Sequence, residues 1–251
     1  MDRLASPSSV ETEFGRASWL IPARIDGVER LDLGQGTLAD AQASLDDMWR
    51  INRFLGGVRA ITSHLYPRLL AASGTATVLD LGTGSAHLAV LIARWAQRHN
   101  RSIRVLGADI NPRHLTIAQT ITSAIPPIRL LHADALHLPF AENSVDYLIS
   151  SLFLHHFTPP QVVALLREAY AHARRGIIFS DIQRGWLPWI GFKLSQPVFV
   201  RSPLTGYDGA LSIRRAYTPA ELRQLAADAG LTHARVTVHP LWRMTLTADK
   251  P

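Results

Sequence analysis

The most chemically informative residues are aspartates that stand at the ends of short apolar runs, the first of them beside two glycines. Asp80 lies in one such run, and Gly82 and Gly84 follow it. Glycines at a turn of this kind allow positive φ and let a ligand lie against bare backbone. The helix expected over residues 85–98 would point its free N–H groups at the same place. The pattern predicts a site for a nucleotide-like ligand.

Two further aspartates repeat this placement. Residues 103–108 lead to Asp109, which stands 25 positions after the second glycine, where a ribose-binding carboxylate is expected. Asn111 and the proline after it form an N-cap and a first helical residue, so Asp109 is expected either to bind ribose or only to help cap that helix. Residues 128–133 lead to Asp134, which can accept a hydrogen bond from an exocyclic amine.

The pattern departs from the dinucleotide-binding fingerprint in two ways. His87 occupies the position at which that fingerprint needs a small residue for close packing of the helix. Asp80 would repel phosphate, but its carboxylate can accept hydrogen bonds from an ammonium group. Both features argue against a nicotinamide cofactor, and an NAD-dependent oxidoreductase is retained only as an alternative.

A pair of histidines follows the fourth apolar run. Residues 145–151 are expected to form a strand, and His155 and His156 come just after it. Ligands bind at the carboxyl ends of such strands, where one imidazole can act as general base for a phenol, an enol or an activated ring carbon. The alternative is that adjacent histidines at the start of a helix only pack or cap.

Together these motifs give residues 74–182 a clear resemblance to a class I S-adenosylmethionine-dependent methyltransferase. The segment SLFLHHF at 151–157 is similar to the small-molecule branch that contains the quinone C-methyltransferases. The resemblance implies S-adenosyl-L-methionine as cofactor, S-adenosyl-L-homocysteine as product, and no metal. One departure is Ala86, which stands where the family's first loop commonly has a third glycine.

The resemblance also implies roles for individual residues. Asp80 would bind the methionine ammonium, Asp109 the ribose hydroxyls, and Asp134 the adenine amine. The full set implied to bind the cofactor is Asp80, Gly82, Thr83, Gly84, Asp109, Ile110, Asp134, Ala135, Ser150 and Ser151. His155 and His156 are the candidate catalytic residues.

The fold class implied is α/β: a doubly wound, mostly parallel seven-stranded sheet of order 3-2-1-4-5-7-6 with the last strand antiparallel. After the fourth strand, the sequence predicts a helix over 159–174, a strand over 176–181, and a helix capped by Thr218 that Gly230 ends. Final strands near 232–239 and 242–247 are joined by so short a link that they must be antiparallel.

Two regions are predicted: an N-terminal arm with capping helices over 1–73, and a methyltransferase core over 74–251. Residues 1–43 are expected to be a partly ordered arm. A helix over 44–55, with a capping-box-like start at Ser44 and Asp47, and a second helix over 58–72 should follow. Four side chains of the first helix are expected either to line the ligand pocket or to pack against the core: Trp49, Asn52, Arg53 and Phe54.

The core carries an insertion over 182–217 that is rich in aromatic residues. Over the carboxyl ends of the strands it would form a lid that excludes water and selects an apolar or aromatic substrate. Alternatives are a buried satellite helix, a dimer face, or a patch that rests on membrane lipid. The residues predicted to bind substrate are Trp186, Trp189, Arg214, His239 and Arg243.

Composition limits the function further. The 251 residues carry a net charge of +6, but their 24 arginines and 2 lysines are scattered, which favours a small-molecule acceptor over nucleic acid. No apolar run approaches the ~20 residues of a membrane span. The lack of cysteine and of an N-terminal secretory pattern favours a cytoplasmic protein. Homodimerisation and peripheral membrane contact stay open.

The sequence therefore predicts a methyltransferase that acts on O or C of a small aromatic, phenolic, quinone-like or polyketide acceptor. The alternative from another class is a methyltransferase-like module that binds the cofactor but transfers nothing.

Overall fold

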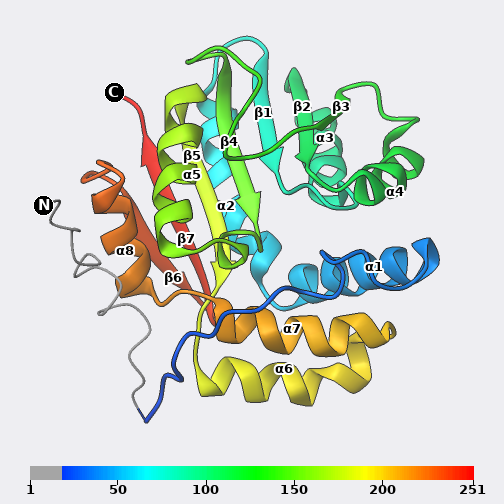
Figure 1. The fold of residues 1–251 in the computed structure, drawn as a ribbon. Coiled ribbons are helices and arrows are strands. Elements are labelled where there is room, and N and C mark those ends of the chain that lie inside the picture. The colour runs from blue at the N-terminus through cyan, green and yellow to red at the C-terminus, as the bar shows by residue number, and fades with distance from the viewer. Residues whose placement is uncertain (1–18) are drawn as a thin grey trace, which may run out of the picture.

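The computed structural model describes residues 19–251, which form a seven-stranded sheet flanked by helices (Figure 1). The strand order is β3-β2-β1-β4-β5-β7-β6, and only β7 runs antiparallel to its neighbours. The strands are β1 Ala76–Leu81, β2 Ile103–Asp109, β3 Ile128–His132, β4 Val145–Ser151, β5 Ala173–Ile182, β6 Arg235–His239 and β7 Arg243–Asp249. The predicted doubly wound fold and the antiparallel final pair are confirmed.

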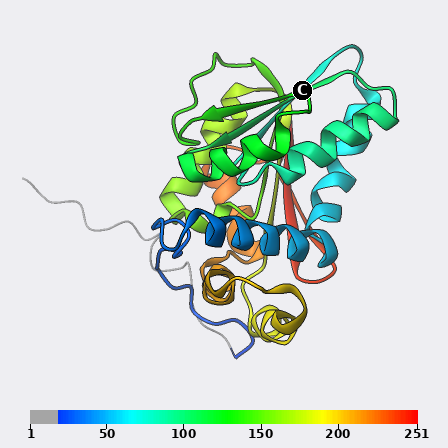
Figure 2. The same ribbon diagram turned by 90° about the vertical axis from the view of Figure 1, so that its right-hand side faces the viewer.

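The central strands are apolar because both of their faces are covered by helices. Helices α2 Gly57–Ala71, α3 His87–Arg98 and α4 Pro112–Thr122 lie on one face. Helices α5 Pro159–His172 and α8 Pro219–Asp228 lie on the other (Figures 1 and 2). Two buried clusters result, one on each side of β1 and β4. This double layer fixes the carboxyl ends of the parallel strands at one edge.

The first helix begins earlier than predicted. Helix α1 covers Leu38–Phe54, and Thr37 and Asp40 form its capping box. The predicted start at Ser44 is therefore wrong, because a complete capping box lies seven residues upstream. Ser44 and Asp47 are buried within the helix instead, and Asp47 Oδ2 accepts the backbone N–H groups of Arg201 and Ser202 at 2.7 and 2.8 Å. Residues 1–18 of the predicted arm lie outside the described residues.

The insertion folds into two helices, α6 Trp186–Phe199 and α7 Pro203–Arg215. Helix α7 packs against α1, and α6 packs on α7 (Figure 1). Both α1 and α7 lie across the carboxyl ends of the parallel strands, as Figures 1 and 2 show. The edge of the sheet where the parallel strands end is thus covered by α1, which precedes the core, and by α7, which lies in the insertion.

Some element boundaries differ from the sequence prediction. Strand β3 ends at His132, so Asp134 lies in the following loop rather than at the strand end. Helix α5 ends at His172 rather than at Arg174, because Arg174 and Arg175 are extended and pair with the buried Asp146. Within residues 19–251, we find no helix with the length and apolar character that a membrane crossing requires.

Candidate active site

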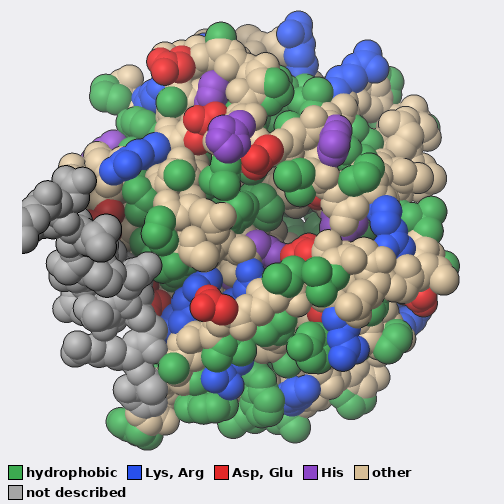
Figure 3. All heavy atoms as spheres, viewed as in Figure 1, with side chains coloured by type: hydrophobic (Ala, Val, Ile, Leu, Met, Phe, Trp, Pro, Cys, Tyr) green, Lys and Arg blue, Asp and Glu red, His purple; other side chains and the backbone are tan. Residues whose placement is uncertain are grey.

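A cavity of about 450 Å³ opens at the carboxyl ends of the strands, between the sheet and helices α1 and α7. Figure 3 shows a hollow near the centre of this face, with acidic and histidine side chains at its edge. Its volume falls within the ~300–1,000 Å³ that small-molecule sites occupy. Loops after β1, β2 and β4 line it, together with residues 29–32 of the N-terminal segment. The cavity joins regions that are far apart in the sequence.

The loop after β1 needs glycine for two reasons. Gly82 has φ +66°, and a Cβ built on it would lie 2.4 Å from the ring of Phe153. Gly84 has φ +54°, and its N–H donates to Asp109 Oδ2 at 2.9 Å. Thr83 and Gly84 also line the cavity. The predicted turn is therefore a bare-backbone cradle beside the neighbouring strand.

Asp80 is a buried carboxylate with little compensation. Its side chain accepts one hydrogen bond, from Thr83 Oγ1 at 2.8 Å, and 2% of its surface is exposed. Burial raises the pKa of Asp80 to about 7, Thr83 opposes this shift, and Asp109 adds to it. Among the described residues, no cationic side chain pairs with this carboxylate. The site is suited to a ligand cation.

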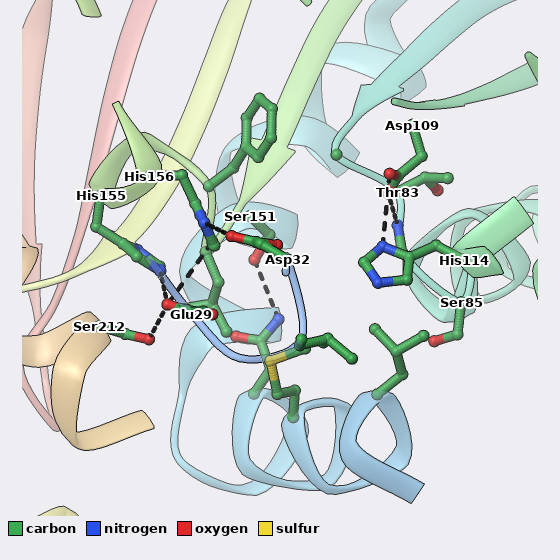
Figure 4. Close-up of a pocket in the computed structure, with 18 of the residues that line it drawn as sticks. Glu29, Asp32, Thr83, Ser85, Asp109, His114, Ser151, His155, His156 and Ser212 are labelled. Carbon is green, nitrogen blue, oxygen red and sulfur yellow. Dashed lines mark hydrogen bonds and ion pairs between the residues drawn. The ribbon is translucent and has the colours of Figure 1, made fainter. Parts of the chain in front are cut away.

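Asp109 ends β2 and organises the second part of the cavity wall. Its Oδ1 accepts the N–H of Asn111 at 2.8 Å and lies 3.5 Å from His114 Nδ1 (Figure 4). Asn111 caps α4, as predicted, through the N–H of Arg113. Asp109 therefore orders both the Gly84 turn and the start of α4, and its carboxylate still faces the cavity.

Three further predicted residues reach the cavity from the loops after β2 and β3: Ile110, Asp134 and Ala135. Asp134 accepts the N–H of Leu136 at 2.9 Å and lies 3.0 Å from His137 Nδ1. The hydrogen bond with His137 is the main reason that its pKa is lowered. Asp80, Asp109 and Asp134 thus line one cavity, which is the central expectation from their spacing.

The two predicted serines differ. Ser151 lines the cavity, and its Oγ accepts Asn52 Nδ2 at 3.0 Å. Ser150 points into the sheet, where its Oγ donates to Leu81 O at 2.9 Å, and it does not line the cavity. Successive side chains of a strand face opposite sides, which explains why only one serine reaches the ligand side.

Helix α1 contributes two of its four candidate residues. Trp49 and Asn52 line the cavity, and Trp49 stacks on His87 with ring centroids 5.2 Å apart. Arg53 and Phe54 lie outside the cavity lining, and Phe54 is largely exposed. His87 lines the cavity beside Trp49.

The structure places only one of the five predicted substrate residues in the cavity lining. Arg243 lines the cavity, and its Nε donates to Leu55 O at 3.1 Å. The other four, Trp186, Trp189, Arg214 and His239, lie outside the lining. Trp186 instead contacts Trp189 edge to face, with Arg214 above it, because the register of α6 turns Phe192 toward the cavity. His239, the last residue of β6, packs against His64 of α2.

The outer side of α6 is apolar and solvent-exposed. Leu187, Ile190, Leu194 and Val198 are exposed there. Helix α6 therefore contributes Phe192 to the cavity and exposes a second, apolar face to solvent. This outer face is consistent with either of the two sequence alternatives, a dimer face or a patch that rests on membrane lipid.

His155 is held between two acids. Its Nδ1 lies 2.8 Å from Asp181 Oδ1, and its backbone N–H donates to Asp181 Oδ2. Its Nε2 lies 3.6 Å from Glu29 Oε1, as Figure 4 shows. Burial would lower the pKa of His155, but Asp181 and Glu29 outweigh burial and raise it to about 9. In this arrangement the imidazole is protonated at neutral pH, which does not favour it as a free general base.

His156 has its own acid partner. Its Nδ1 lies 2.8 Å from Asp32 Oδ2, and its Nε2 lies 4.0 Å from Glu29 Oε1. Burial would raise the pKa of Glu29, but the two histidines and the hydroxyl of Ser212 lower it to about 2. Ser212 Oγ donates to Glu29 Oε1 at 2.5 Å. Figure 4 shows these groups converging on one end of the cavity.

Sequence reasoning missed four residues of this cluster: Glu29, Asp32, Asp181 and Ser212. Glu29 and Asp32 lie in the segment that was expected to be a loosely ordered arm, and no local pattern marks them. Asp181 could have been noticed because it ends β5, which places it beside the residues that follow β4.

Comparisons with known proteins agree with this geometry. The methyltransferase domain family matches residues 78–176. An uncharacterized methyltransferase of Mycobacteroides abscessus is 30% identical over 223 residues, which cover 78% of this chain and 80% of that protein. A demethylmenaquinone methyltransferase of Staphylococcus epidermidis is 27% identical over 104 residues, which cover 38% of this chain and 42% of that enzyme.

A solved structure supports the fold. The S-adenosylmethionine-dependent methyltransferase of Aquifex aeolicus superposes with a TM-score of 0.58 and 15% identity, covering 86% of this chain and 99% of that chain. The chain belongs to the class I S-adenosylmethionine-dependent methyltransferases and resembles their quinone C-methyltransferase branch. Its cofactor is S-adenosyl-L-methionine, and the uncompensated Asp80 and the glycine cradle fit that cationic ligand.

Proposed function

We propose that this enzyme methylates O or C of a small aromatic, phenolic, quinone-like or polyketide acceptor. The observation that carries the proposal is that one cavity contains both the Asp80–Asp109 loops and the Glu29–His155–His156 cluster. A cofactor on the loops and an acceptor on the cluster would then share one enclosed space. The relative that acts on demethylmenaquinone, by its name, supports an aromatic ring as the acceptor.

The cofactor half of the cavity follows from the resemblance. Asp80 binds the ammonium group, Asp109 the ribose hydroxyls, and Asp134 the adenine amine in this proposal. Gly82 and Gly84 give the cofactor access to bare backbone, and Ser151 lies beside its amino-acid portion. The bound cofactor supplies an electrophilic methyl group on a sulfonium.

The proposed acceptor half has apolar walls beside the histidine cluster and Arg243. Phe153, Ile182, Phe192 and Ile213 line it, so a planar apolar ring suits its walls. The polar groups of Glu29, His155 and His156 lie where a hydroxyl or keto oxygen of that ring can be held. The protein's contribution is alignment, exclusion of water and management of the acceptor's proton.

Binding of S-adenosyl-L-homocysteine tests the cofactor half. We expect calorimetry to give one binding site, and Asp109→Ala to weaken it at least ~10-fold, the loss of about 1.4 kcal/mol of binding free energy. Asp228→Ala, on α8 and away from the cavity, is the control and should bind as the parent does. A parent protein with no measurable affinity, or one that NAD stabilises against heat in place of this product, would refute the proposal.

Turnover tests the acceptor half. The enzyme is incubated with S-adenosyl-L-methionine and a panel of phenols, naphthoquinols, enols and polyketide pyrones, and products are identified by mass spectrometry. We expect a mass gain of one methyl group on at least one ring acceptor. Cofactor binding without methylation of any member would favour the silent binding module. The cytoplasmic location expected from the sequence stays a prediction.

A further inference from the structure

The two histidines at the acceptor end are oriented by separate carboxylates. Asp181 lies 2.8 Å from His155 Nδ1, and Asp32 lies 2.8 Å from His156 Nδ1. An imidazole whose Nδ1 is held in this way presents Nε2 on the opposite side of the ring. Both Nε2 atoms face the same atom, Glu29 Oε1 (Figure 4). Two imidazoles, each with its outer nitrogen already bonded, therefore converge on one carboxylate oxygen, which also accepts from Ser212 Oγ at 2.5 Å.

The inner distances are longer than the outer ones. Nε2 of His155 lies 3.6 Å and Nε2 of His156 lies 4.0 Å from Glu29 Oε1. Direct N–H···O hydrogen bonds span ~2.7–3.2 Å, so neither inner pair is in normal hydrogen-bond contact. Two ligands on one tetrahedral ion with bonds of ~2.1 Å stand ~3.4 Å apart. The three ligand atoms, all within 4.8 Å of one another, need only a small inward movement to share a cation.

We propose that Glu29, His155 and His156 form a binding site for a divalent transition-metal ion of the zinc class. Two imidazoles and one carboxylate are a ligand set that Zn²⁺ uses at sites with an open coordination position. The carboxylates behind both imidazoles are the outer-shell partners that such histidines normally have. No metal is expected from the sequence, because the sulfonium cofactor itself supplies the activated methyl group.

Charge and burial support a cation at this place. Three carboxylates, Glu29, Asp32 and Asp181, surround two imidazoles, and Glu29 and Asp181 are almost fully buried. A divalent ion would displace the proton that His155 carries in the free protein and would offset part of this negative charge. Two guanidinium groups lie nearby, but the hydrogen bonds of both go to backbone carbonyls: Arg215 donates to His156 O and Arg243 donates to Leu55 O.

The proposed ion would also define the acceptor, a step that rests on the proposed function. All three ligands line the cavity, so an open coordination position faces the space assigned to the acceptor. A hydroxyl or enol oxygen bound there would lose its proton more readily, since metal ions lower the pKa of coordinated oxygen. The preferred acceptor class is therefore one with an oxygen that can act as ligand.

Metal binding is tested on the full-length protein after chelator dialysis, by calorimetry with Zn²⁺ and by visible absorption with Co²⁺. We expect one equivalent to bind, with a tetrahedral or five-coordinate Co²⁺ spectrum. Glu29→Gln and His156→Gln should each lower the affinity at least ~10-fold, and Asp32→Asn about 10- to 100-fold. His64→Gln, in the separate His64–His239 pair, is the matched control and should bind like the parent.

Circular dichroism and the affinity for S-adenosyl-L-homocysteine establish that each variant is folded. The proposal is overturned if the parent binds no stoichiometric Zn²⁺ or Co²⁺, or if Glu29→Gln and His156→Gln bind as the parent does. Absence of metal together with loss of turnover in His156→Gln would assign that histidine a direct proton-transfer role instead. If the parent protein does not bind S-adenosyl-L-homocysteine, the proposed function is refuted but the metal site is not, because metal binding is measured without that ligand.

Discussion

At the scale of single residues, two of the cavity aspartates differ in their hydrogen-bond donors. Asp109 accepts backbone N–H groups from Gly84 and Asn111. Asp80 is as deeply buried but has one hydroxyl donor, so its pKa is raised to about 7. Ionisation of Asp80 is therefore costly in the free protein, and we expect it to become favourable when a ligand ammonium binds beside it.

The affinity for S-adenosyl-L-homocysteine should therefore depend on pH through Asp80. Below pH 7 the carboxyl is mostly protonated and must lose its proton to pair with the ligand ammonium, so affinity falls as pH falls. With a pKa of about 7, we expect roughly 30-fold weaker binding at pH 5.5 than at pH 8. Calorimetry across this range measures it.

The Asp80→Asn variant should bind S-adenosyl-L-homocysteine weakly, and its affinity should not change between pH 5.5 and 8. The folded pKa of Asp80 lies above the value of ~3.9 for an unfolded chain, so its ionisation destabilises the free protein as pH rises from about 4 to 7. Asp80→Asn should accordingly melt at a higher temperature than the parent at pH 8. Asp146→Asn, a buried carboxylate at the opposite end of β4, should change stability but keep the pH dependence of binding. A parent affinity that is flat between pH 5.5 and 8 contradicts this assignment.

At the scale of elements, the α6–α7 hairpin shapes the acceptor half. Gly209 on α7 lies against the ring of Phe192 on α6, and both line the cavity. A Cβ on Gly209 would lie 2.4 Å from Phe192 Cζ. The absence of a side chain at one position thus sets how closely two helices approach and where an aromatic wall stands.

Gly209→Ala should displace Phe192 and cost about 1–3 kcal/mol of unfolding free energy, as overpacking does. Gly206→Ala, one turn earlier on the same helix, has open space with nothing nearer than 3.9 Å, and should stabilise by about 0.5–1 kcal/mol. Thermal and urea unfolding measure both. Affinity for the cofactor product should stay within threefold in either variant, and equal stability effects in the two would contradict the packing argument.

At the scale of the whole molecule, the N-terminal helices share the core of the sheet. Ile61, Leu65 and Leu69 of α2 are fully buried against β1, β4 and β5. Glu29 and Leu31 are buried too, and the backbone of Arg30 and Leu31 donates to Asp208 on α7. The predicted boundary at residue 73 therefore separates segments that pack as one body.

A chain beginning at residue 74 should not fold on its own. Truncation of one buried Leu or Ile costs about 2–5 kcal/mol, and loss of three approaches the whole stability of about 5–15 kcal/mol. Circular dichroism and size exclusion should show a loss of cooperative unfolding and aggregation. Cooperative melting and cofactor binding by residues 74–251 would instead make 1–73 a dispensable cap.

Much of the cofactor half was predictable because its signals are local. Asp80, the two glycines and Asp109 are each fixed by a strand end and the turn that follows it, and parallel strands bring their carboxyl ends to one edge. Ser150 was wrongly expected to line the cavity. Successive side chains of a strand point to opposite faces, and the sequence does not show which of two adjacent serines faces the ligand. The aromatic residues of α6 were misplaced because helix register relative to a cavity depends on packing.

The amino-acid sequence by itself determined the fold, the cofactor class and the adjacency of three cavity carboxylates, Asp80, Asp109 and Asp134. Only the tertiary structure decided what surrounds the histidine pair. Glu29 and Asp32 reach it from one N-terminal segment, Asp181 from β5 and Ser212 from α7, and no periodicity or spacing links these three segments. Strand ends and turns follow from local patterns and the strand order from the family resemblance, whereas a cluster built across an N-terminal segment, two strand ends and an inserted helix exists only once the chain has packed.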